Sequence, residues 1–198
     1  MEEKVIRKLN RLKKTGIIKD YAVGGAHAVA YYLEPIKTLD FDIFVFVGSD
    51  HDFYVFRTYI KKAGFKIRGT HVIIDDTPVH FLPGSLHPIF NEAVKKAKRI
   101  RVRNIPTKVL TVEYLIASLL MSFRLKDKMV IPDLLKVANI VLLRQIAFMA
   151  RCKTDMLSGL IIKSPPASAG ALRAGRLAPL LRHAQDGESR RTICQRGG

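Results

Sequence analysis

The sequence reads DYAVGGAHAVAYYL over residues 20–33 and TLDFDIFVFV over residues 38–47. The first stretch predicts a short strand, a break at Gly24-Gly25 and a helix of small residues. The second stretch is rich in β-branched and aromatic residues and predicts a strand. The second half of that strand is apolar on both faces, which is typical of a central strand in a covered sheet.

Two acidic residues near the start of the second stretch, Asp40 and Asp42, are candidate metal ligands. Residues two apart in a strand point to the same face, so both carboxylates would project together, with Cα atoms about 6–7 Å apart. Neighbouring carboxylates repel each other unless a cation lies between them, and Mg²⁺ favours carboxylate oxygens and substrate phosphates.

The Gly24-Gly25 turn has a matching chemical interpretation. Glycine lets the backbone approach a phosphate closely, and the N-terminus of the following helix offers free N–H groups. A triphosphate on this turn and a metal on the acidic pair would lie close together, which is the arrangement that phosphoryl or nucleotidyl transfer needs. A Gly-Gly pair alone is commonly just a turn, and an Asp-x-Asp pattern alone is commonly a solvated strand end. The hypothesis of nucleotidyl transfer therefore depends on the two motifs occurring together in this order.

The remaining sequence predicts alternating helices and strands, and then helices alone. Helical spacing of apolar residues predicts helices over 3–15, 26–33, 51–63, 87–97, 112–123, 126–137 and 140–150. Further strands are expected over 66–74, 78–82 and 99–103. Thr111 is the expected N-cap of helix 112–123, and Gly16 is the expected end of the first helix.

The charge of the chain bears on its partners. It has 34 Lys and Arg against 17 Asp and Glu, a net charge of +17. This excess favours acidic partners such as nucleic acid or nucleotides, and a solubilising surface is an equally weighted interpretation. The basic run over residues 95–103 is either a solvated edge strand or a track for an RNA acceptor such as tRNA.

The sequence predicts no membrane segment. The longest charge-free stretch in the helical half, Tyr114 to Phe123, is too short to span a bilayer, and the charged N-terminus has no apolar signal-peptide core. Cys152 and Cys194 lack metal-type spacing and are typical of free thiols in a reducing compartment. We therefore expect a cytoplasmic protein.

The sequence resembles the DNA polymerase β-type nucleotidyltransferase superfamily in two runs, VGGAHAVA over residues 23–30 and KTLDFDIFV over residues 37–45. Its nearest group is identified as the small prokaryotic proteins related to AbiEii-type toxins and minimal nucleotidyltransferases. Two further runs, YLIA over 114–117 and RLKD over 124–127, resemble the helical segment that follows the catalytic sheet. The resemblance covers residues 1–150.

This resemblance implies an α+β fold, with a mixed β-sheet flanked by helices. Residues 1–105 would form the catalytic domain and residues 106–150 a helical extension, followed by a tail over 151–198. The activity it implies is transfer of a nucleoside monophosphate from an NTP to an acceptor hydroxyl on RNA or protein. A toxin role, with an antitoxin protein as partner, is also implied.

The resemblance also implies roles for individual residues. Gly24 and Gly25 would seat the triphosphate, Asp40 and Asp42 would ligate Mg²⁺ or Mn²⁺, and Lys37, Thr38 and Lys126 would bind phosphate. His27, early in the helix after Gly-Gly, is either a phosphate contact or a packed side chain.

One departure concerns a third carboxylate, which the superfamily usually carries on a later strand as base for the acceptor hydroxyl. The matching strand here carries His80. A histidine acts as a general base near neutral pH, ligates a transition metal or marks a site that has lost catalysis. Asp75 and Asp76 are poorer substitutes, because turn positions are less fixed.

Two alternative functions follow. The first is a catalytically degenerate module that retains nucleotide or RNA, which the histidine favours. The second is an Asp-x-Asp sugar-nucleotide transferase, which fits less well because the Gly-Gly helix suits a triphosphate.

The composition changes near residue 151. Before it, 16 lysines accompany 9 arginines, whereas from Arg151 onward 2 lysines accompany 7 arginines. The later segment also contains Ser164-Pro165-Pro166 and repeated Ala and Gly, so residues 163–198 are expected to be poorly ordered. A specific hypothesis is that this tail is not native to the domain.

Overall fold

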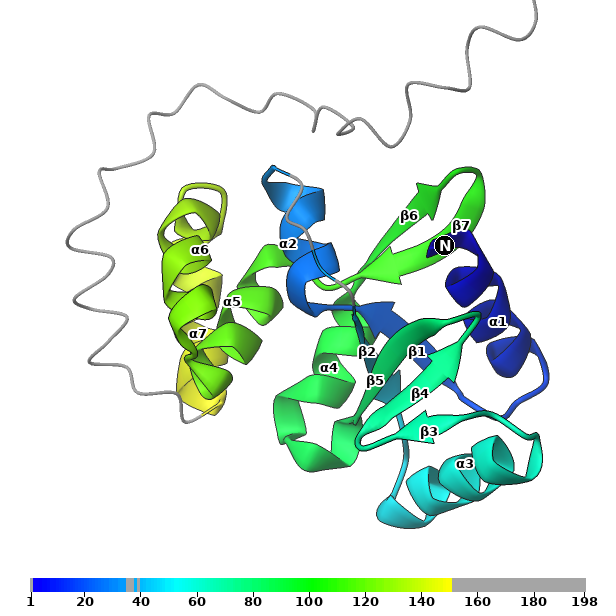
Figure 1. The fold of residues 1–198 in the computed structure, drawn as a ribbon. Helices are drawn as coiled ribbons and strands as arrows, with labels where there is room; N and C mark the ends of the chain where they lie inside the picture. The colour runs from blue at the N-terminus through cyan, green and yellow to red at the C-terminus, as the bar shows by residue number, and fades with distance from the viewer. Residues whose placement is uncertain (1, 35–37, 39, 151–198) are drawn as a thin grey trace, which may run out of the picture.

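The computed structural model describes residues 2–34, 38 and 40–150, so the predictions for Lys37, both cysteines and the tail lie outside the described residues. Figure 1 shows a sheet with helices on both faces and a group of helices at one side. The helices are α1 (Glu2–Lys14), α2 (Gly25–Tyr32), α3 (Asp50–Lys62), α4 (Pro88–Lys96), α5 (Val112–Ser122), α6 (Leu125–Leu135) and α7 (Ile140–Met149), with a 3₁₀ turn over Gly84–Leu86. The strands are β1 (Asp20–Val23), β2 (Phe41–Phe46), β3 (Ile67–Arg68), β4 (His71–Ile74), β5 (Thr77–Pro83), β6 (Lys98–Val102) and β7 (Ile105–Val109).

Within the described residues, seven strands form one mixed sheet in the order β3-β4-β5-β2-β1-β7-β6. Strand β2 is parallel to β5, and β1 is parallel to β7, whereas the other neighbours are antiparallel. The expected α+β fold with a mixed sheet is confirmed. The stretch around the Gly24-Gly25 turn supplies β1 and β2 near the middle of this sheet.

Each face of the sheet carries its own hydrophobic core. Helices α1 and α3 cover one face, where Leu9 and Phe56 pack with Ile43 of β2. Helices α2, α4, α5, α6 and α7 contribute to the core on the other face, which includes Phe44 of β2 and Leu115. Neighbouring strand residues point to opposite faces, so β2 supplies both cores. None of the described helices is long and apolar enough to cross a membrane.

Three strand predictions need correction. The strand expected over 38–47 begins only at Phe41, and the strand expected over 66–74 is a hairpin of β3 and β4. Its two-residue turn contains Gly69 at a φ of +58°, a conformation that favours glycine. Strand β7 was not predicted, because Pro106 and Lys108 break the usual strand composition.

Helix α5 begins where the sequence predicts, but its first turn is capped differently. Thr111 occupies the N-cap position, yet its buried hydroxyl makes no hydrogen bond within the described residues. Glu113 lies in the first turn and is buried. Its carboxylate accepts a hydrogen bond of 2.9 Å from the backbone N–H of Asn139, which caps α7, so Glu113 links the two helices.

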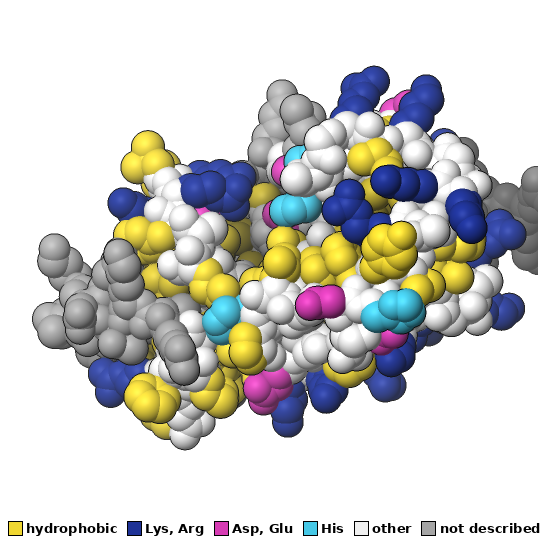
Figure 2. Space-filling view, turned by 90° about the horizontal axis from the view of Figure 1, so that it is seen from below, with side chains coloured by type: hydrophobic (Ala, Val, Ile, Leu, Met, Phe, Trp, Pro, Cys, Tyr) yellow, Lys and Arg dark blue, Asp and Glu magenta, His cyan; other side chains and the backbone are white. Residues whose placement is uncertain are grey.

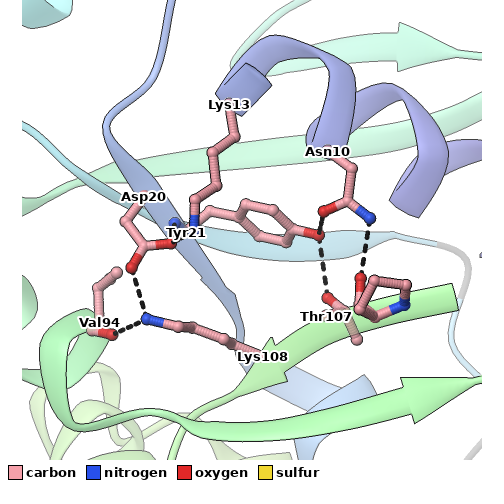
Figure 3. A network of polar contacts seen from close by, with 8 residues as sticks. Asn10, Lys13, Asp20, Tyr21, Val94, Thr107 and Lys108 are labelled. Atoms are coloured by element: carbon pink, nitrogen blue, oxygen red, sulfur yellow. Dashed lines mark hydrogen bonds and ion pairs between the residues drawn. The ribbon is translucent and has the colours of Figure 1, made fainter. Parts of the chain in front are cut away.

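An ion-pair cluster joins α1, β1 and β7 (Figure 3). Asp20 at the start of β1 accepts hydrogen bonds from the ammonium groups of Lys13, at 2.6 Å, and of Lys108. Partial burial alone would raise the pKa of Asp20, but these two bonds and its contact with the Tyr21 N–H outweigh burial and hold the pKa below 3.8.

The hydroxyl of Tyr21 continues this cluster beneath α1 (Figure 3). It donates to Asn10 at 2.8 Å and accepts from Thr107 at 3.1 Å, and Asn10 donates in turn to the Pro106 carbonyl at 2.8 Å. Burial raises the pKa of Tyr21 to about 12, so the phenol stays protonated and can donate. These bonds fix β7, the strand absent from the sequence prediction, beside β1.

We expect Asp20→Asn to lower the free energy of unfolding by about 1–2 kcal/mol at pH 7, because two charge-assisted hydrogen bonds lose their anionic acceptor. The folded-state pKa of Asp20 lies below its unfolded value, so its stabilisation is present above the unfolded pKa and disappears as pH falls through the folded pKa. Urea unfolding should therefore show a smaller gap between variant and wild type at pH 3 than at pH 7.

The control is Asp50→Asn, which removes an exposed carboxylate that makes no ion pair with a described residue. It should leave stability nearly unchanged at both pH values. A gap for Asp20→Asn that is as large at pH 3 as at pH 7 would contradict the ion-pair explanation.

Candidate functional site

A row of polar residues crosses four neighbouring strands beside the Gly24-Gly25 turn. Asp42 of β2 pairs with His80 of β5, His80 pairs with His71 of β4, and His71 pairs with Arg68 of β3. Directly opposed residues on adjacent strands project to the same face. The four side chains therefore run across one face of the sheet, from a carboxylate through two imidazoles to a guanidinium.

Two carboxylate–imidazole contacts lie at the acidic end of this row. The Nδ1 atom of His80 lies 3.3 Å from Oδ1 of Asp42, and the Nε2 atom of His71 lies 3.8 Å from Oδ2 of Asp40. The two imidazole rings are neighbours, with centroids 5.3 Å apart. Asp40 and Asp42 thus face the same pair of histidines.

Asp40 reaches this position in an unexpected way, because it precedes β2 and is not part of it. Its carboxylate accepts a hydrogen bond of 2.9 Å from the Thr38 hydroxyl, a local bond that competes with strand pairing. Burial alone would raise the pKa of Asp40, but hydrogen bonds from Thr38 and its own backbone, with the charges of Lys126 and His71, hold it below 3.8. Asp40 is therefore ionised at neutral pH.

Lys126 brings the helical segment to the site. It lies in the first turn of α6, within electrostatic range of Asp40. The buried carboxylate of Asp127 fixes this turn, since it accepts hydrogen bonds from the Ser122 hydroxyl at 2.7 Å and from the Arg124 backbone N–H at 3.0 Å. The sequence-predicted phosphate ligand Lys126 thus approaches the acidic pair from a separate helix.

The two glycines of the turn have different surroundings. A Cβ atom on Gly24 would lie 2.3 Å from the Phe44 ring, so the absence of a side chain at Gly24 leaves room for this ring in the core. A Cβ atom on Gly25 would lie 2.0 Å from Oδ2 of Asp42, and Gly25 has a φ of +53°. The Gly24 N–H also donates to the Asp42 carbonyl at 2.8 Å. The turn and the Asp42 carboxylate are therefore built against each other.

His27 packs against the protein. Its ring stacks on Phe41 with centroids 3.6 Å apart, and its Nε2 atom lies 3.8 Å from a Glu2 carboxylate oxygen. Burial lowers the pKa of His27 despite three acidic neighbours, so the imidazole is neutral at pH 7. This geometry favours the packed-side-chain interpretation over a phosphate contact.

An open pocket of about 700 Å³ adjoins the acidic pair. Its lining includes Thr38, Asp40, Lys66, Arg68, His71 and Asp76. Figure 2 shows histidine and acidic side chains next to each other on one face of the molecule, with lysine and arginine side chains on both sides of them.

The sequence did not single out Lys66, Arg68 or His71. One signal could have found them: Gly69-Thr70 is a two-residue hairpin turn, which places Arg68 opposite His71. The basic run over 95–103, by contrast, lies around β6 at the opposite edge of the sheet.

The acidic pair has a donor set that fits Mg²⁺. Mg²⁺ in nucleotide sites is usually held by one or two carboxylates, with substrate phosphates and water completing its shell. Within the described part of the chain, no three His, Cys, Asp or Glu residues are arranged to hold a metal by themselves. A metal at Asp40 and Asp42 would consequently depend on the nucleotide for further ligands.

Solved structures with a similar fold include an antigenic nucleotidyltransferase-like protein from Paracoccidioides brasiliensis. It is 16% identical, with a TM-score of 0.51 over 79% of this chain and 90% of that chain. The fold of the present chain is nucleotidyltransferase-like.

Two structures of ANT(2'')-Ia align less well. A crystal structure in complex with adenylyl-2''-tobramycin has a TM-score of 0.49 at 11% identity, over 76% of this chain and 97% of that one. A solution structure has a TM-score of 0.48 at 11% identity, over 78% and 93%. No protein-family model and no curated protein sequence matches the chain.

Gly25→Ala is expected to displace the Asp42 carboxylate and to destabilise the fold more than a glycine substitution in open space. Gly64→Ala is the matched control, since Gly64 also has positive φ, +74°, but a Cβ there would meet nothing within 4 Å. The control should cost about 1 kcal/mol from backbone strain alone, and Gly25→Ala more than that. Thermal melts of both variants measure the difference, and equal losses would show that Asp42 does not occupy this space.

Proposed function

We propose that the chain transfers a nucleoside monophosphate from an NTP to an acceptor hydroxyl, with a divalent cation at Asp40 and Asp42. One observation carries the proposal: the Asp42 carboxylate lies in the space that Gly25 leaves, so the acidic pair adjoins the turn before α2. The nucleotidyltransferase-like fold supports it. The acceptor class is RNA or protein, and a toxin role with an antitoxin partner stays a prediction from sequence resemblance.

The chain's own residues supply phosphate contacts on two sides of the acidic pair. Backbone N–H groups at the start of α2 point toward the Gly24-Gly25 turn, where the positive end of the helix dipole favours a triphosphate. Lys126 of α6 faces the pair from the helical segment, and Thr38 orients Asp40. When bound, Mg²⁺ supplies charge neutralisation at the reacting phosphate. Lys37 stays a sequence prediction for the same role.

We assign the role of general base to His80, and its contact of 3.3 Å with Asp42 supports this assignment. If its Nδ1–H donates to Asp42, the lone pair on Nε2 is free to accept the proton of the acceptor hydroxyl. The carboxylate then fixes the tautomer and orientation of the imidazole, as in other carboxylate–histidine pairs. His80 would thus replace the third carboxylate that the superfamily usually carries.

A second candidate function is a degenerate module that binds nucleotide without transferring it. The sequence resemblance favours it, because His80 matches the strand position where the superfamily usually carries a third carboxylate. Substitutions at Asp42 and His80 distinguish the two functions.

We expect the protein, incubated with radiolabelled NTPs, Mg²⁺ or Mn²⁺ and total RNA or protein acceptors, to transfer label. Asp42→Asn should abolish transfer, because it removes the anionic ligand beside the turn, whereas Asp50→Asn on α3 should not change it. His80→Ala should lower kcat by about 10²–10⁴-fold with a smaller effect on the KM for the NTP, which is the range of a lost general base.

His80→Asp separates the two candidate functions, because it restores a carboxylate at the third position. An enzyme that uses His80 as its base should retain transfer in His80→Asp. A degenerate module should bind NTP without transfer as wild type and gain transfer only in His80→Asp. Wild-type protein that neither binds nor transfers any NTP contradicts both functions.

A further inference from the structure

We propose that Lys66 and Arg68 form a subsite for the phosphodiester backbone of a nucleic-acid acceptor, whose terminal hydroxyl then reaches the acidic pair. The inference rests on the proposed nucleotidyl transfer and selects nucleic acid, not protein, as the acceptor. It concerns residues of the β3–β4 hairpin that the sequence did not assign to the site.

The hairpin places both cations on the same face as the acidic pair. Arg68 is paired with His71 in the row that ends at Asp42. Lys66 directly precedes β3, its carbonyl accepts a hydrogen bond from the Ile73 N–H at 2.8 Å, and it lines the same pocket as Arg68. Three strand spacings of about 4.8 Å separate Arg68 from Asp42, which puts their backbones roughly 14 Å apart. The pocket bounded by these residues is continuous from Lys66 and Arg68 to Asp40.

Both cations are available to a ligand. Lys66 and Arg68 are exposed, and neither side chain makes an ion pair, cation–π contact or hydrogen bond with the described residues. Around β6, by comparison, Arg103 pairs with Glu3 at 2.9 Å, and Lys98 lies over the Tyr31 ring at 5.4 Å. The hairpin therefore presents unpaired positive charge beside the site, whereas the basic run around β6 is partly neutralised and lies at the other edge.

The chemistry of the pocket favours an anionic acceptor. Besides Asp40 of the acidic pair, the pocket lining carries one carboxylate, Asp76, against the two cations Lys66 and Arg68. The excess cation at the hairpin attracts an anionic group, and each phosphate it neutralises releases bound counterions. Between the cations and Asp40, the apolar side chains of Ile73 and Pro78 line the pocket and can contact a sugar or base. The acidic pair, neutralised by its cation, would then receive the terminal hydroxyl.

The test measures binding of fluorescein-labelled single-stranded RNA to the full chain by anisotropy over a range of salt concentrations. Lys66→Ala/Arg68→Ala should bind about tenfold more weakly at low salt, and the slope of log K against log salt should fall by about 1.4, or 0.7 for each lost phosphate contact. Single-stranded DNA of the same sequence is measured in parallel, because DNA and RNA share the phosphodiester group. An equal loss of affinity for RNA and for DNA supports recognition of this group.

Two further variants serve as controls. Lys61→Ala/Lys62→Ala removes the same charge from the exposed end of α3 and should retain wild-type affinity and slope. Lys66→Arg/Arg68→Lys keeps both charges and should also bind as wild type. Circular dichroism melts of every variant verify that the exposed substitutions preserve the fold.

Three results would overturn the subsite: no RNA binding by the wild-type chain, wild-type affinity in Lys66→Ala/Arg68→Ala, or an equal loss in Lys61→Ala/Lys62→Ala. Binding of Mg-ATP is measured separately and should be the same in all these variants. A chain that binds RNA through the hairpin but neither binds nor transfers NTP would refute the nucleotidyl transfer and not the subsite.

Discussion

The missing side chain of Gly25 determines where the Asp42 carboxylate lies. Any Cβ at residue 25 would overlap this carboxylate, and the positive φ of the residue already excludes most other amino acids. One residue earlier, Gly24 admits the Phe44 ring in the same way. The two glycines thus let β2 pack closely under the start of α2, with its acidic residue toward the turn and its aromatic residue in the core. Phosphate contact from the turn is compatible with this packing but is not needed to explain either glycine.

Strand β2 therefore couples the stability of the fold to the geometry of the site. Ile43 and Phe44 are buried in the cores on opposite faces, while Asp42 lies on the same face as Phe44 and is only partly buried. A register shift of β2 by one residue would turn Asp42 to the opposite, buried face of the sheet and would place Ile43 on the face that carries the site. The ladders to β1 and β5 hold this register from both sides, so the strand alone positions the Asp42 carboxylate. Asp40 precedes β2 and depends instead on its hydrogen bond from Thr38.

The sequence was sufficient for elements that depend on local patterns. The Gly-Gly turn, the central strand and the helices follow from composition and apolar spacing, and so does the nearness of Asp42 to the turn. It was insufficient where pairing between distant segments decides the structure. Strand β7 forms because it pairs with β1, where Val109 lies opposite Val23, a residue 86 positions earlier in the sequence. It does so despite Pro106. His71 joins the site through the register of β4 with β5, which the sequence analysis missed because it expected residues 66–74 to form one strand.

The order of charges along the row constrains what the site can bind. A carboxylate, two imidazoles and a guanidinium lie on successive strands, so the face changes from acidic to basic over one short distance. The backbones of Asp42 and Arg68 lie roughly 14 Å apart, so a small cation at Asp42 leaves Arg68 unpaired and a small anion at Arg68 leaves Asp42 unpaired. Two ligands of opposite sign, a metal cation at the acidic end and a phosphate-bearing chain at the basic end, satisfy both. A third carboxylate in place of His80 would extend the acidic end into the middle of the row and repel an anionic acceptor there, whereas the imidazole adds no negative charge.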